Sequence, residues 1–134
     1  MDSLLRKLAE LYSGPLKSPE KALAYAKTAR ELLPDDPAVT KVLGRAVYLN
    51  ADFKWAYVLL QPENTKPTSD AEALRTLAWS AYALGKVTEA EQIMKRITEL
   101  AADSEAAADA RAFLSMSSPE RMARLPGKLK ETSR

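Results

Sequence analysis

The chain contains neither cysteine nor histidine, and each absence removes a class of chemistry. Without cysteine there is no disulfide and no thiolate nucleophile, and without histidine no imidazole base is available. Zinc sites built from these two residue types are excluded as well. Glycine is scarce, with 4 residues, and aromatic residues make up only 7% of the chain. Because alanine is used heavily instead, the composition favours helices over sheets.

Charge and hydropathy exclude further classes of function. The net charge of +2 is too small to indicate a nucleic-acid partner by itself. No stretch approaches the roughly 20 apolar residues of a membrane span, and the first residues lack the basic start and long apolar core of a signal peptide. We therefore expect a soluble chain as given, without membrane insertion and of unknown cellular location.

Catalytic motifs are also missing from the sequence. There is no glycine-rich phosphate loop, no nucleophile motif and no metal-ligand spacing, and the carboxylates do not gather at one place. We therefore expect no enzyme, no metal and no cofactor.

The strongest positive feature is a period of 34 residues, which is clearest in the segment 71–104. Leu74, Leu77, Ala78 and Ala81 follow the i, i+3, i+4, i+7 spacing of a helix with one apolar face. Leu84-Gly85-Lys86 is expected to end this helix, since glycine adopts the positive φ of a turn. A second helix follows, and its apolar side is formed by Ala90, Ile93, Met94, Ile97 and Leu100.

Capping signals set the starts of the expected helices. Ser69 with Glu72, and Thr88 with Glu91, have the spacing of a capping box. One period earlier, Asp36-Pro37 is an N-cap followed by proline at the first helical position. One period earlier still, only the second helix keeps the register. It is expected to start at Ser18-Pro19-Glu20 and to end at Leu33-Pro34. Its inner side is formed by small residues: Ala22, Ala26 and Ala29.

Two further helices complete the expected elements. One spans about residues 3–13, with Leu4, Leu8, Leu11 and Tyr12 on one face, and lies out of register, so we expect a short insertion or deletion near Gly14-Pro15. The other runs from about 104 to 116 and presents Ala107, Ala110, Phe113 and Leu114 to the last core face.

These spacings resemble the tetratricopeptide repeat (TPR) family over about residues 3–104. The residues that match are Leu74, Leu77-Ala78, Ala81, Ala90, Met94 and Ile97 in one unit, and Leu43-Gly44, Val47, Ala56 and Leu60 in the unit before. The resemblance implies an all-α, right-handed superhelix of about three antiparallel helix pairs, with units at about 3–36, 37–70 and 71–104 and a capping helix at 104–116. The repeat domain would then span 1–117, and 118–134 would be a short helix with a polar, basic tail.

The resemblance also implies a concave groove lined by the first helix of each unit. The groove positions on which we base our prediction form a basic and aromatic strip: Lys41, Arg45, Tyr48, Arg75, Trp79 and Tyr82. Arginine with tyrosine or tryptophan suits an extended peptide that carries carboxylates and apolar side chains. Arg45 and Trp79 stand where the family's carboxylate-clamp members have asparagine, so capture of a free C-terminal carboxylate in that manner is not expected. The alternative is that the aromatic residues pack between helices and the cations are solvated.

A second candidate surface lies in the apolar segment 53–60, which the repeat register predicts to be a helix. Its apolar residues occupy all sides, more than one inward face requires. One interpretation is that the loop after Gln61-Pro62 folds back over it. The other is a second interface, formed by Phe53, Trp55, Val58 and Leu59 and used in a homodimer.

The last residues, 121–134, carry five cations: Arg121, Arg124, Lys128, Lys130 and Arg134. A solvated terminus is the expectation, and electrostatic binding of a nucleic acid or an acidic lipid is the alternative. The sequence thus predicts a non-catalytic protein–protein interaction module or scaffold with an unidentified protein or peptide partner. The alternative function is a structural spacer or self-association segment of a larger repeat protein.

Overall fold

The computed structural model describes residues 2–13, 18–66 and 70–127, and this part of the chain is all-helical without strands. It forms α1 (Asp2–Ser13), α2 (Pro19–Leu32), α3 (Pro37–Leu49), α4 (Phe53–Leu60), the 3-10 helix η1 (Gln61–Thr65), α5 (Ala71–Ala83), α6 (Val87–Leu100), α7 (Glu105–Ser115) and α8 (Ser118–Ala123). The expected break at Gly14-Pro15 and the side chain of Tyr12 lie outside the described residues. None of the described helices is long and apolar enough to cross a membrane.

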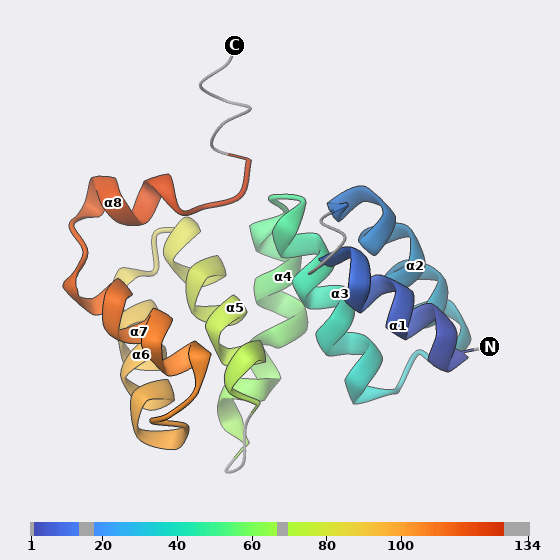
Figure 1. The fold of residues 1–134 in the computed structure, drawn as a ribbon, viewed down its shortest axis with the longest axis horizontal. Helices are drawn as coiled ribbons and strands as arrows, with labels where there is room; N and C mark the ends of the chain where they lie inside the picture. Colours follow the sequence, from blue (N-terminus) through green and yellow to red (C-terminus); the bar gives the residue numbers. More distant parts are fainter. Residues whose placement is uncertain (1, 14–17, 67–69, 128–134) are drawn as a thin grey trace.

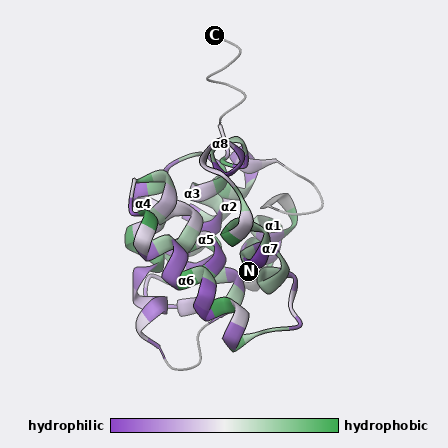
Figure 2. Ribbon diagram, turned by 90° about the vertical axis from the view of Figure 1, so that its left-hand side faces the viewer, coloured by the Kyte–Doolittle hydropathy of each residue, from purple (hydrophilic) through white to green (hydrophobic). Residues whose placement is uncertain are grey.

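The helices are arranged in two rows (Figure 1). From α1 to α7, each helix packs against the next, and α3 also contacts both α1 and α5, as α5 contacts α7. The first row is therefore α1, α3, α5 and α7, and α2, α4 and α6 form the second. Figure 2 shows hydrophilic and hydrophobic residues on the same helices, as expected for amphipathic helices that bury one face.

Several helix ends follow the sequence closely, whereas the cap expected at Thr88 is wrong. The Asp36 carboxylate accepts a hydrogen bond from the Ala38 N–H at the start of α3, and Gly85 has a φ of 83° in the turn after α5. At the start of α5, the Asp70 carboxylate accepts from two backbone N–H groups, whereas the capping box expected at Ser69 lies outside the described residues. Lys86 precedes α6 without any side-chain cap, so Thr88 lies inside the helix. An aspartate directly before the helix satisfies N–H groups that have no partner within the helix.

Small residues occupy the points of closest helix contact. Gly44, Ala56, Ala78 and Ala90 are all buried. A Cβ added at Gly44 would lie 2.6 Å from the Cγ and Cδ2 atoms of Leu60, so even a methyl group lacks room there. The short α4 therefore packs directly on the backbone of α3.

The segment after α4 is fixed against α6 and α5. Arg96 of α6 donates to the Asn64 carbonyl oxygen over 2.8 Å, and the Asp70 N–H donates to the Glu63 carboxylate over 2.9 Å. The loop expected to fold back over the apolar surface of α4 includes residues 67–69, which lie outside the described residues. The ammonium group of Lys27, on α2, lies 5.6 Å from the centre of the Trp55 ring.

Candidate functional site

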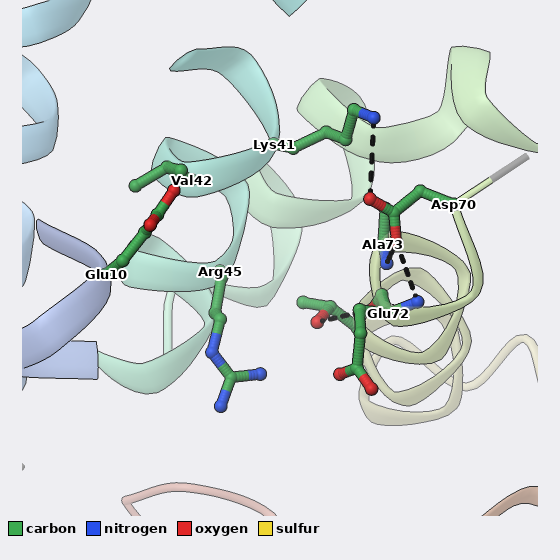
Figure 3. A pocket seen from close by; sticks show the side chains of 8 residues that line it. Glu10, Lys41, Val42, Arg45, Asp70, Glu72 and Ala73 are labelled. Carbon is green, nitrogen blue, oxygen red and sulfur yellow. Dashed lines mark hydrogen bonds and ion pairs between the residues drawn. The ribbon is translucent and has the colours of Figure 1, made fainter. Parts of the chain in front are cut away.

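The six residues predicted to line a groove all lie on α3 and α5, the central helices of the first row. Two hollows open along these helices. The first, of about 140 Å³, is formed by α1, α3 and α5 (Figure 3); its lining residues are Glu10, Lys41, Val42, Arg45, Asp70, Glu72, Ala73 and Thr76. The second, of about 150 Å³, is lined by Arg45, Tyr48, Leu49, Arg75, Thr76, Trp79, Asp109 and Arg124. Only Arg45 and Thr76 line both hollows, which therefore meet at these two residues.

The first hollow has apolar walls and a charged rim. Val42 and Ala73 contribute apolar surface from α3 and α5. On the rim, the Lys41 Nζ lies 3.4 Å from the Asp70 carboxylate, the same group that caps α5. The Glu10 carboxylate, also at this hollow, lies 3.7 Å from the Arg6 Nε. A partner would meet an apolar floor between the paired charges of Lys41 and Glu10.

The second hollow contains three arginines. Arg75 forms an ion pair with Glu72, and the Arg124 guanidinium donates to the Asp109 carboxylate over 2.7 Å. Arg45 makes no ion pair or hydrogen bond through its side chain with any residue that the structure describes. It is therefore the arginine here that remains available to a partner.

Tyr48 is buried beside this hollow, and both its burial and the nearby charges shift the pKa of its hydroxyl. Burial raises the pKa of the Tyr48 hydroxyl well above its usual value, and the negative charge of Asp109 raises it further. The positive charges of Arg124, Arg45 and Arg75 oppose this rise. The hydroxyl is consequently neutral throughout the physiological pH range and can serve as a hydrogen-bond donor.

Trp79 and Tyr82 are buried in the core, and Trp79 also lines the second hollow. Trp79 is only 4% exposed, and its indole Nε1 donates to the Asp109 carboxylate over 2.9 Å. The rings of Trp79 and Tyr82 meet the ring of Phe113 edge-on, at centre distances of 4.9 and 5.6 Å. Of the two interpretations of these aromatic residues, the structure supports packing between helices. The side chains that remain at the surface of the strip are those of Lys41, Arg45 and Arg75.

Two cations of the expected solvated tail are part of the fold. Arg121, on α8, is 7% exposed; its Nε donates to the Phe113 carbonyl oxygen over 3.0 Å, and its Nη1 donates to Glu91 over 3.2 Å. Its guanidinium also lies 4.0 Å from the centre of the Phe113 ring, at a distance typical of a cation–π contact. Arg124 similarly covers the Trp79 ring at 5.5 Å. The expectation of a solvated segment is wrong at Arg121, whereas Arg124 stays exposed while it pairs with Asp109. Lys128, Lys130 and Arg134 lie outside the described residues.

The second candidate surface, on α4, is only partly open. Val58 is 61% exposed, whereas Phe53, Trp55 and Leu59 are half-buried and pack against the core. The Tyr57 hydroxyl donates to the Glu89 carboxylate over 2.8 Å, which ties α4 to α6.

Comparison with protein-family models finds no match, and comparison with curated proteins likewise finds none. The geometry of the two hollows is therefore the basis for assigning a function.

Proposed function

We propose that this protein is a non-catalytic recognition module that binds an extended segment of a partner protein along α1, α3 and α5. In this proposal the three helix pairs form a right-handed superhelix of the TPR type, and α7 caps its end. The repeated 34-residue spacing and the two rows of helices support this architecture. The first row then forms the inner, concave surface.

The observation that carries the proposal is the hollow between α1, α3 and α5. It combines an apolar floor of Val42 and Ala73 with a rim of opposite charges, and it continues into the second hollow through Arg45. Apolar floors with a few polar groups at the edge are typical of binding sites. An extended segment can cross both hollows, placing one apolar side chain in the first and a polar one in the second.

A matched pair of substitutions tests this proposal. Val42→Arg fills the first hollow from α3, and Val58→Arg makes the same chemical change on the exposed side of α4. Peptides with random sequences, amidated at the C-terminus, are first selected on the wild-type protein. We expect the Val42→Arg variant to lose at least tenfold in affinity for them, measured by fluorescence polarisation, and the Val58→Arg variant to bind as the wild type does.

Circular dichroism and thermal unfolding of both variants serve as the folding control. If no peptide is selected, or if Val42→Arg binds as tightly as the wild type, the proposal is wrong. Loss of binding in Val58→Arg alone would place the interaction on α4 instead.

Self-association is a separate question, and the observation that favours a dimer is the exposed Val58. Sedimentation of the wild-type protein and of the Val58→Arg variant tests it. A wild-type protein that stays monomeric contradicts the dimer.

A further inference from the structure

Arg45 is a half-buried cation without a counter-ion among the described residues. Figure 3 shows the contrast with its neighbour on α3: Lys41 points toward Asp70, whereas the Arg45 side chain extends between α3 and α5 without a marked partner. A partly buried charge has lost some of its hydration and has no compensating contact. Arg45 therefore gains more from an incoming anion than a fully exposed cation does.

The other charges of the second hollow determine which anion fits. Arg75 and Arg124 flank the same hollow, but each is already paired with a carboxylate, Glu72 and Asp109 respectively. Among the described residues at this hollow, three guanidinium groups against two carboxylates leave one positive charge. A singly charged carboxylate neutralises this excess, whereas a doubly charged phosphate would leave a negative charge behind.

We propose that Arg45 binds the side-chain carboxylate of an aspartate or glutamate within the partner segment. This inference rests on the proposed function and specifies the chemistry of the ligand. A guanidinium group matches a carboxylate with two parallel N–H···O bonds, which fixes the orientation of the ligand. The apolar hollow next to Arg45 then takes a neighbouring apolar side chain of the same segment. The recognised sequence is an internal acidic residue beside an apolar one, and it needs no free C-terminus.

The test uses the peptides selected on the wild-type protein, resynthesised with each acidic residue replaced by glutamine. We expect one replacement to weaken binding to the wild type about 10- to 100-fold, as the loss of a hydrogen-bonded charge does. The same replacement should have little effect on the Arg45→Gln variant, because the two changes remove the same contact. Lys95→Gln, which removes one exposed cation from α6, is the matched control and should behave as the wild type does.

A spectroscopic readout locates the contact. The chain has 2 tryptophans, and Trp79 lies at the second hollow whereas Trp55 lies on α4. The indole N–H resonance of Trp79 should shift on addition of the acidic peptide, and that of Trp55 should not. The Arg45→Gln variant should remain folded, since Arg45 makes no ion pair within the described residues.

The possible results separate this inference from the proposed function. Selected peptides that lose binding in Val42→Arg, but contain no acidic residue or bind Arg45→Gln unchanged, overturn the inference and leave the proposed function in place. Failure to select any peptide overturns the proposed function itself. A peptide with phosphoserine in place of the critical acidic residue gives the last comparison. Tighter binding of this peptide than of the carboxylate form would contradict the assignment of a carboxylate.

Discussion

The α3–α4 pair and the α5–α6 pair have equivalent residues 34 positions apart, but the two pairs use some of them differently. Leu43 corresponds to Leu77, and both are buried. Arg45 corresponds to Trp79; the arginine lies at the surface between two hollows, whereas the tryptophan is enclosed. Trp79 is covered because Phe113 of α7 and Arg124 after α8 pack against it. Among the residues that the structure describes, no comparable layer closes over Arg45.

This difference shows that the place of a residue in the repeat does not decide its role alone. The same face of the first helix is a surface in one unit and a core in the next, depending on which helix follows. A large aromatic residue is favourable where α7 covers it, because burying its area removes apolar surface from water. A half-buried cation is tolerated where the face stays open to solvent.

The largest expected effect compares these two equivalent positions. Trp79→Ala removes a buried ring and leaves a cavity, so the free energy of unfolding should fall by about 3–5 kcal/mol. Arg45→Ala removes a side chain without an ion pair in the described structure and should change it by less than about 0.5 kcal/mol. Urea unfolding, followed by circular dichroism, measures both. If both substitutions lowered the free energy of unfolding by the same amount, the two positions would be packed alike and the comparison would be wrong.

A smaller effect is expected where the two pairs differ in their closest helix contact. Gly44 faces Leu60, and the equivalent positions one unit later are Ala78 and Met94. Gly44→Ala forces a contact with Leu60 and should destabilise the protein by about 1–3 kcal/mol, partly offset by about 0.5–1 kcal/mol from better helix propensity. Adding Leu60→Met reproduces the pair found in the α5–α6 unit and should recover part of the loss, because methionine adapts its shape more easily.

The test of this contact is a double-mutant cycle in thermal or urea unfolding. Recovery in the double variant, beyond the sum of the single effects, confirms that Gly44 is required by the Leu60 side chain. Strictly additive effects would show that Gly44 has another reason to be small.

The smallest expected effect concerns Glu63, which links the end of α4 to the start of α5. Burial alone would raise the pKa of Glu63, but the hydrogen bond from the Asp70 N–H and the contact with Lys66 outweigh it, so that the pKa lies below its usual value. A lowered pKa means that the ionised form stabilises the fold above the unfolded-state pKa, and that this contribution is lost as the pH falls through the folded-state value. Glu63→Gln should therefore cost about 1 kcal/mol near pH 6 and progressively less toward pH 3. A difference from the wild type that stays constant across this range would contradict the role of the charge.

The helices and their small contact residues follow from local sequence signals. Apolar spacing, Asp36-Pro37 and Gly85 act within a few residues, so the start of α3 and the end of α5 can be predicted from the chain itself. The burial of Trp79 cannot be predicted in this way, because it depends on α7 and α8, whose positions are set by packing. Arg121 is the clearest omission: it resembles any solvated cation in the sequence, and only its contact with Phe113 and Glu91 reveals its role. The unpaired state of Arg45 likewise depends on which carboxylates the fold brings near it.

The position of Arg121 also bears on how the protein is made. Proteins are synthesised from the N-terminus, and helical segments begin to fold as they emerge. The Phe113 carbonyl oxygen and Glu91 acquire their arginine partner only after the chain has been extended to residue 121. Until then Phe113 and Tyr82 lack their cover. The nascent chain therefore leaves this aromatic cluster open to solvent until Arg121 has joined the fold.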